Sequence, residues 1–169
     1  MTDDERTRQS AVRFWAAAGA VVVLDQLTKL LARAALGVDR PVAVVPGFFD
    51  LKLRFNSGAA FGILPDWAPL FILAALVAIY AIARLRQAGE GSRGLALGLG
   101  LVMGGALGNL VDRLASAERE VTDFLSFYIR LGGKTYAWPT FNLADAAIVV
   151  GAILVICHVY VIEKRRTNG

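Results

Sequence analysis

The chain has 169 residues, of which 56% are hydrophobic and only 19% are charged. A soluble domain of this size carries more charge and shorter apolar runs, so the composition argues against a soluble globular protein. The net charge of +4 is modest, and the basic residues lie at the ends of apolar blocks, which favours lipid headgroups over nucleic acid as their neighbours. The single cysteine, Cys157, excludes an internal disulfide and is expected to be buried.

Four apolar blocks have about the 20 residues that a helix needs to cross a hydrocarbon core of about 30 Å. In chain order they lie at residues 14–36, 67–85, 94–114 and 141–162. Lipid offers no partner to backbone polar groups, so the blocks are expected to be helices rather than strands. The prediction is an all-α integral membrane protein, with one membrane domain over residues 1–169 and two long extracytoplasmic loops.

An even number of spans places both termini on one side of the membrane and the two long loops, 37–66 and 115–140, on the other. Nine Lys and Arg residues belong to the side of the termini and seven to the side of the loops. Because basic segments stay in the cytoplasm, the count favours cytoplasmic termini, and the charge-dense segments 84–93 and 163–166 strengthen this prediction. In either orientation the two long loops face the same compartment and can meet.

The two long loops carry strand patterns. Residues 49–55 alternate apolar and charged side chains, which is typical of a strand with one apolar face. Segments 123–131 and 134–141 flank Gly132 and Gly133, a pair typical of a hairpin turn. We therefore expect a small sheet at the membrane surface, forming a cradle for an extended peptide that enters from the bilayer.

Ionisable residues inside the spans need an explanation, because each costs at least about 2.5 kcal/mol at a helix centre. Asp25 and Lys29 lie four residues apart in the first span, with the acid first, which suits an ion pair on one helix face. The pair either neutralises itself within the helix or helps to hold a functional site.

The third span ends in a cluster of polar residues. Asn109, Asp112 and Arg113 have the spacing that places them on one helix face, and the small residues of GGALG at 104–108 let another helix approach closely. Two interpretations remain open. One is a packing seam finished by an interfacial Asp112–Arg113 pair, and the other is a polar wall that faces a substrate cavity.

Two further carboxylates lie at the loop side of the membrane. Asp145 follows Asn142 by three residues, as in a capping box at a helix start, and Asp123 alone would be an ordinary loop carboxylate. Both belong to the same side and to neighbouring segments, so they can form a pair that shares one proton and activates water. Other hydrolytic mechanisms lack the residues that they need. Zinc proteolysis needs two histidines, and His158 is the only histidine of the chain. It lies at the opposite end of the fourth span, so it is too far from the long loops to form a serine–histidine pair there.

Five motifs in this order resemble those of the lipoprotein signal peptidases of bacteria, also called signal peptidase II. They are LDQLTK at 24–29, RFNSGAAFGIL at 54–64, GGALGNLVDR at 104–113, VTDF at 121–124 and FNLADAAI at 141–148. The resemblance covers nearly the whole chain. It implies a membrane aspartic endopeptidase that cleaves prolipoprotein signal peptides before a diacylglyceryl-modified cysteine, without a metal or another cofactor.

The resemblance also implies roles for individual residues. It makes Asp123 and Asp145 the catalytic pair. The residues that it implies in substrate binding are Asn56, Asn109, Arg113 and Asn142, and those expected to be structural are Asp25, Lys29 and Asp112. Two departures from the family pattern are mild: Ser57 replaces the common threonine after the asparagine, and Thr122 replaces the common valine before Asp123.

The implied partners are diacylglyceryl-modified prolipoproteins and membrane lipids, and the protein is expected to act as a monomer. Its implied location is the bacterial inner membrane, with cytoplasmic termini and the active site at the outer face. On the residues alone, two other functions remain open. A proton-coupled transporter would depend on Asp25 within a span, whereas a helix-packing scaffold would need neither Asp123 nor Asp145.

Overall fold

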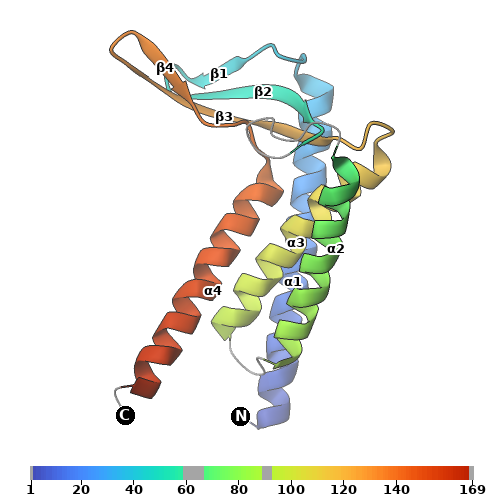
Figure 1. Cartoon of the computed structure of the whole chain (residues 1–169), viewed down its shortest axis with the longest axis vertical. Helices are drawn as coiled ribbons and strands as arrows, with labels where there is room; N and C mark the ends of the chain where they lie inside the picture. The colour runs from blue at the N-terminus through green and yellow to red at the C-terminus, as the bar shows by residue number, and fades with distance from the viewer. Residues whose placement is uncertain (1, 59–66, 89–92, 168–169) are drawn as a thin grey trace.

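The computed structural model describes residues 2–58, 67–88 and 93–167 (Figure 1). Four helices and four strands follow one another in this part of the chain. The helices are α1 (Asp3–Ala35), α2 (Ala68–Ala88), α3 (Arg93–Ala115) and α4 (Leu143–Thr167), and the strands are β1 (Val42–Val45), β2 (Phe49–Asn56), β3 (Val121–Leu131) and β4 (Lys134–Ala137). Each helix contains a segment long and apolar enough to cross a membrane, which confirms the four predicted spans. Residues 59–64 of the RFNSGAAFGIL motif and 89–92 of the charged loop lie outside the described residues.

The expected all-α class is too narrow, because the two long loops form a four-stranded antiparallel sheet in the order β1-β2-β3-β4. The strand predicted at residues 49–55 is β2, and the predicted hairpin is β3–β4. Its turn residues Gly132 and Gly133 have φ of +56° and +75°, the left-handed conformation that a type I′ turn needs at both positions. Asp123 lies within β3, the first strand of the predicted hairpin, which begins at Val121 because residues 121–127 also pair with β2.

Figure 1 places the sheet at one end of the helices and both termini at the other, as an even number of spans requires. α1 begins at Asp3, well before the predicted start at residue 14. Thr2 caps this helix: its hydroxyl accepts a hydrogen bond from the Glu5 N–H (3.2 Å), and the Glu5 carboxylate accepts one from the Thr2 N–H (3.0 Å). This capping box allows a polar first turn to extend the helix beyond the apolar block.

α3 lies at the centre of the helix packing and contacts α1, α2 and α4. Its glycines allow the close helix approach that the sequence predicted. A Cβ on Gly104 would lie 2.7 Å from the Ala18 carbonyl oxygen and 2.7 Å from the Val21 Cβ, both on α1. Only a small part of α4 is buried, and Cys157 on this helix is exposed, so its expected burial is wrong.

Gly104→Ala is expected to destabilise the folded protein by about 1–3 kcal/mol, because the added methyl group must push α1 and α3 apart. Gly19→Ala on α1 is the matched control, since a Cβ there meets no atom within 4 Å and alanine favours a helix more than glycine does. Thermal unfolding in detergent should give a lower midpoint for Gly104→Ala and an equal or higher one for Gly19→Ala. Equal midpoints for the two variants would show that this helix contact tolerates separation.

Phe141 fixes the sheet beside the start of α4. Its carbonyl oxygen accepts hydrogen bonds from the N–H groups of Phe124 (3.0 Å) and Leu125 (2.8 Å), and its own N–H donates to the Leu125 carbonyl (3.0 Å). Its ring stacks on Phe127, whose ring also stacks on Phe49 of β2. β3 is thereby held next to the first turn of α4, which brings the two predicted catalytic segments together.

Candidate active site

Asp145 lies in the first turn of α4, where Asn142 is the N-cap. The Asn142 side-chain oxygen accepts a hydrogen bond from the Asp145 N–H (3.0 Å), and the Asp145 carboxylate accepts one from the Asn142 N–H (3.2 Å). This reciprocal pair is the capping box that the sequence predicted. The cap holds the Asp145 carboxylate in a fixed orientation at the end of the helix.

Asp123 enters the same region from β3 and is buried. Its carboxylate accepts hydrogen bonds from the amide nitrogen of Asn142 (2.8 Å) and from that of Asn56 (3.0 Å). Asn56 reaches the carboxylate because β2 pairs with β3 and ends opposite Val121. Sheet pairing, which joins residues far apart in the sequence, therefore supplies one of the two donors to Asp123.

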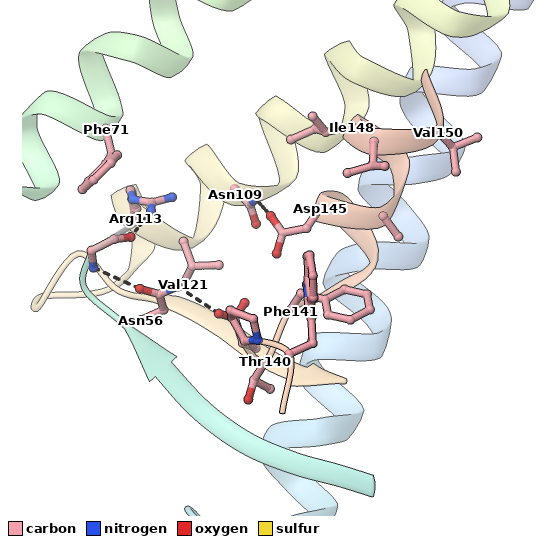
Figure 2. Close-up of a pocket in the computed structure, with 16 residues that line it drawn as sticks. Asn56, Phe71, Asn109, Arg113, Val121, Thr140, Phe141, Asp145, Ile148 and Val150 are labelled. Atoms are coloured by element: carbon pink, nitrogen blue, oxygen red, sulfur yellow. Dashed lines mark hydrogen bonds between the residues drawn. The ribbon is translucent and has the colours of Figure 1, made fainter. Parts of the chain in front are cut away.

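Asn109 of α3 completes the link between the two carboxylates. Its side-chain nitrogen donates to Asp145 (2.7 Å), and its side-chain oxygen accepts a hydrogen bond from the Asn142 amide nitrogen (3.1 Å). Figure 2 shows Asn109 directed at Asp145. Asn142 is fully buried and touches Asp123, Asn109 and Asp145 at once. The site therefore combines two carboxylates, one from β3 and one from α4, that are held by amide donors.

A cavity of about 640 Å³ opens beside these groups (Figure 2). Both aspartates line it, as do three of the four polar residues predicted to bind substrate, namely Asn56, Asn109 and Arg113. The fourth, Asn142, lies fully buried behind the carboxylates. Apolar side chains from α2, β3, the Phe141 segment and α4 form much of the remaining wall, including Phe71, Val121, Phe141, Ile148, Val149 and Val150.

Arg113 lines the cavity from the last turn of α3 (Figure 2). Its guanidinium lies 5.4 Å from the centre of the Phe71 ring and donates a long hydrogen bond to the Gly58 carbonyl (3.4 Å). Its Nε is buried and has no hydrogen-bond partner among the described residues. A buried donor without a partner costs free energy, so this atom does not contribute to holding the side chain in place.

Asp25, Lys29 and Asp112 form a buried ionic cluster behind the site. Lys29 Nζ lies 2.8 Å from Asp25 and 3.2 Å from Asp112, and it donates to the Asn109 side-chain oxygen at 3.0 Å. Asp25 also accepts a hydrogen bond from the Ala144 N–H at the start of α4 (2.9 Å). The Asp25–Lys29 pair therefore does both things that the sequence left open, because it neutralises itself and ties α1 to the site.

Asp112 pairs with Lys29, because α1 brings a buried cation against this part of α3. Of the two interpretations left open for this cluster, the one that paired Asp112 with Arg113 at the interface is therefore not supported. Asp112 also accepts hydrogen bonds from the Thr122 N–H (2.9 Å) and from the Gln26 amide (3.0 Å). The sequence did not single out Gln26, because it carries no charge, although an amide inside a span also needs a partner.

Burial raises the pKa of the Asp123 carboxyl from its ordinary value of 3.8 to about 7, and the nearby charge of Asp145 acts in the same direction. Hydrogen bonds from Asn56 and Asn142 and the positive charge of Lys29 oppose this rise in the pKa. Near neutral pH the Asp123 carboxyl therefore keeps its proton for a large part of the time, whereas an aspartate in water is ionised.

The raised pKa of Asp123 predicts that the folded protein loses stability as the pH rises. Between pH 3.8 and about 7 the folded state binds more protons than the unfolded state, so the free energy of unfolding falls across this window and levels off above it. From pH 5 to pH 8 the loss should be about 3 kcal/mol. Thermal unfolding in detergent should show a smaller loss for Asp123→Asn than for the unchanged protein, and equal losses would contradict the raised pKa.

The chain is similar to known proteins over most of its length. The sequence pattern of the family described as signal peptidase (SPase) II matches residues 17–161. The lipoprotein signal peptidase of Symbiobacterium thermophilum is 40% identical over 147 residues, which cover 86% of this chain and 93% of the relative. That of Oleidesulfovibrio alaskensis is 44% identical over 148 residues, which cover 85% of this chain and 91% of the relative.

Two solved structures of bacterial membrane enzymes, determined by the in meso method at 2.3 Å and 1.9 Å resolution, are each 29% identical to this chain. The first has a TM-score of 0.76 and covers 86% of this chain and 85% of its own. The second has a TM-score of 0.73 and covers 85% and 90%. The match over residues 17–161 includes every element that lines the cavity, and the chain therefore belongs to the signal peptidase II family.

Proposed function

We propose that this protein removes signal peptides from prolipoproteins, cleaving before a diacylglyceryl-modified cysteine with water activated between Asp123 and Asp145. The observation that carries the proposal is the position of these two carboxylates, which line one cavity and both hydrogen-bond to Asn142. Family membership makes the chain a multi-pass peptidase of the bacterial inner membrane. The relatives described above carry the name lipoprotein signal peptidase.

In the proposed reaction Asp123 holds a proton and Asp145 is the ionised base. Asp145 accepts hydrogen bonds from Asn109 and from the Asn142 N–H, a pattern that suits a carboxylate. Asp145 takes a proton from a water molecule between the two groups, and the water oxygen attacks the scissile carbonyl carbon while Asp123 protonates the carbonyl oxygen. The C–N bond then breaks, the leaving nitrogen takes the proton from Asp145, and the reformed carbonyl returns a proton to Asp123.

The remaining polar groups of the cavity are proposed to hold the peptide backbone. The guanidinium group of Arg113, which lines the cavity, would donate to a carbonyl oxygen of the substrate. Asn56 is itself fixed, because its side-chain oxygen accepts the Gly58 N–H at 3.0 Å while its nitrogen donates to Asp123. Holding the scissile bond against both carboxylates would supply much of the rate acceleration by orientation alone.

The cavity is suited to an apolar peptide that arrives from the bilayer. Figure 1 shows α2 and α4 spaced apart along most of their length, and the cavity wall runs along α4 through Ile148 to Val150. Val149 and Val150 are 59% and 51% exposed, as expected for side chains that face acyl chains. The helix of a signal peptide would therefore approach the aspartates sideways, with its lipidated cysteine near the sheet.

The proposed orientation places both termini in the cytoplasm and the aspartates at the outer face. The support is the excess of basic residues on the side of the termini, together with the position of the sheet at the opposite end of the helices (Figure 1). The two acyl chains of the substrate would then remain in the outer leaflet and hold the cysteine at the interface.

A proton-coupled transporter has less support. That function would depend on Asp25, which is fully buried, pairs with Lys29 and accepts the Ala144 N–H. Asp25 does not line the cavity, and its ion pair and hydrogen bond already explain why a carboxylate is present inside this span. A protein that served only as a helix-packing scaffold would not need two aspartates, Asp123 and Asp145, to line one cavity.

The test uses the purified protein in detergent and a prolipoprotein peptide in two forms that differ only in the diacylglyceryl group on the cysteine. Mass spectrometry of the products should show cleavage immediately before the modified cysteine and no cleavage of the unmodified peptide. Equal cleavage of both forms would contradict the proposed specificity, and cleavage at a different bond would contradict the proposed scissile site.

A further inference from the structure

Lys29 is connected to both proposed catalytic carboxylates through amide side chains. Its ammonium group donates to the Asn109 oxygen at 3.0 Å, and the Asn109 nitrogen donates to Asp145 at 2.7 Å. The same Asn109 oxygen accepts a hydrogen bond from Asn142, whose nitrogen also donates to Asp123. One amide therefore separates Lys29 from Asp145, and a second amide continues the link to Asp123.

The chemistry of the ammonium group fixes the direction of this link. An ammonium group only donates hydrogen bonds, so the Asn109 oxygen must face Lys29 and the Asn109 NH₂ group is left to face Asp145. The reversed amide would place its oxygen against the carboxylate and its NH₂ group against the cation. Asn142 supports the same orientation with an uncharged donor at 3.1 Å, and a charge-assisted bond such as that of Lys29 is about twice as strong.

Burial makes the charge of Lys29 effective at the site. The Lys29 side chain is fully buried and does not line the cavity, so neither water nor the substrate touches it. Other charged groups also surround the two aspartates. They are Asp25 and Arg33 from α1 and Asp112 and Arg113 from α3, and the charge of Asp145 itself acts on Asp123.

We propose that Lys29 is a positioning residue of the peptidase reaction, which holds Asp145 through Asn109 as the ionised base and thereby leaves the shared proton on Asp123. This inference rests on the proposed function of the site. It differs from a purely structural ion pair, because an ion pair that only stabilises the helices would not change the rate constant of the folded enzyme.

The experiment must remove Lys29 together with one of its two carboxylate partners, so that the net charge of the buried cluster stays the same as in the unchanged protein. Asp25→Asn is the reference protein, because Lys29 keeps Asp112 as its partner at 3.2 Å and the asparagine oxygen can still accept a hydrogen bond from α4. Asp25→Asn/Lys29→Met then differs from the reference only at Lys29. In this double variant Asp112 keeps its donors Gln26 and Thr122.

Two more variants complete the set. Asp25→Asn/Lys29→Gln restores an uncharged donor and replaces the methionine variant if that one does not fold. Lys52→Met removes a partly exposed lysine of β2 that pairs with Asp39, and it controls for the loss of a cation away from the site. Thermal unfolding checks that each protein is folded, and kcat and KM for the lipidated peptide are then measured from pH 5 to pH 9.

Relative to Asp25→Asn, the loss of Lys29 should lower kcat at least about tenfold and leave KM unchanged within about threefold. The positive charge of Lys29 lowers the pKa of Asp123, so both double variants should move the alkaline fall of kcat/KM to higher pH than in the reference protein. Lys52→Met should match the unchanged protein in both respects.

Equal kcat and equal alkaline falls with and without Lys29 would overturn the inference and leave Lys29 with a structural role. A failure of the proposed function is distinguishable from this outcome. In that case the unchanged protein would not cleave the lipidated peptide, or Asp123→Asn would cleave it as fast as the unchanged protein does.

Discussion

Asp145→Asn and Asp123→Asn are each expected to lower the rate of lipidated-peptide cleavage by at least about 10³-fold. The first substitution removes the group proposed to take a proton from water. The second replaces an acid that donates a proton by an amide that does not. Asparagine has nearly the size of aspartate and still forms hydrogen bonds, so both variants should insert and fold. The measurement is the initial rate of cleavage at saturating peptide, corrected for the folded fraction of each preparation.

Asp50→Asn is the matched control for these substitutions. Asp50 lies on β2 outside the cavity, where it accepts a hydrogen bond from the Tyr128 hydroxyl at 3.2 Å. The control variant should cleave the peptide at the rate of the unchanged protein. If Asp123→Asn or Asp145→Asn keeps more than about a tenth of the activity, that aspartate does not perform the proton transfer assigned to it.

Lys29→Met is expected to destabilise the protein by about 3–5 kcal/mol. The substitution leaves Asp25 and Asp112 buried without the cation that lies 2.8 Å and 3.2 Å from them. An unpaired buried carboxylate loses its hydration without compensation, so this loss is much larger than that of an exposed ion pair. In a chain of this length it corresponds to a fall of about 10 °C in the midpoint of thermal unfolding in detergent.

Asp25→Asn/Lys29→Met shows how much of the stability lost in Lys29→Met comes from the unpaired charge and how much from the lost packing of the lysine side chain. Because this variant removes one charge of each sign, it should recover a large part of the stability that Lys29→Met loses. The unchanged protein, the two single variants and the double variant form a cycle that yields the interaction energy of the pair. A midpoint for Lys29→Met equal to that of the unchanged protein would show that the cluster does not stabilise the fold.

The spans and the hairpin could be predicted from the sequence because their signals are local. A long apolar run predicts a helix in lipid, and the alternation over residues 49–55 predicts a strand regardless of its partner. Strand register is not a local property: the pairing of Asn56 with Val121 joins two loops that lie on either side of α2 and α3. The hydrogen bond that Asn56 donates to Asp123 could therefore not be predicted from either segment alone.

In the site as well, contacts between residues close in the sequence could be predicted, and contacts between distant elements could not. Asn142 and Asp145 are three residues apart on one helix, so their capping box could be predicted. The contacts of Asn142 with Asp123 and Asn109 bring together three elements and depend on how these elements pack. The partner of Asp112 likewise lies on α1, which the residue spacing within α3 does not reveal.

The dependence of kcat/KM on pH tests most directly whether Asp123 and Asp145 share one proton in the reaction, because kcat/KM reports the ionisation of the free enzyme. The pKa of Asp123 is raised to about 7, so its carboxyl holds a proton below that pH and loses it above. Because the proposed reaction needs the protonated form of Asp123, we expect kcat/KM for the lipidated peptide to fall about tenfold per pH unit above about pH 7. A kcat/KM that stays constant or rises from pH 6 to pH 9 would contradict the shared proton.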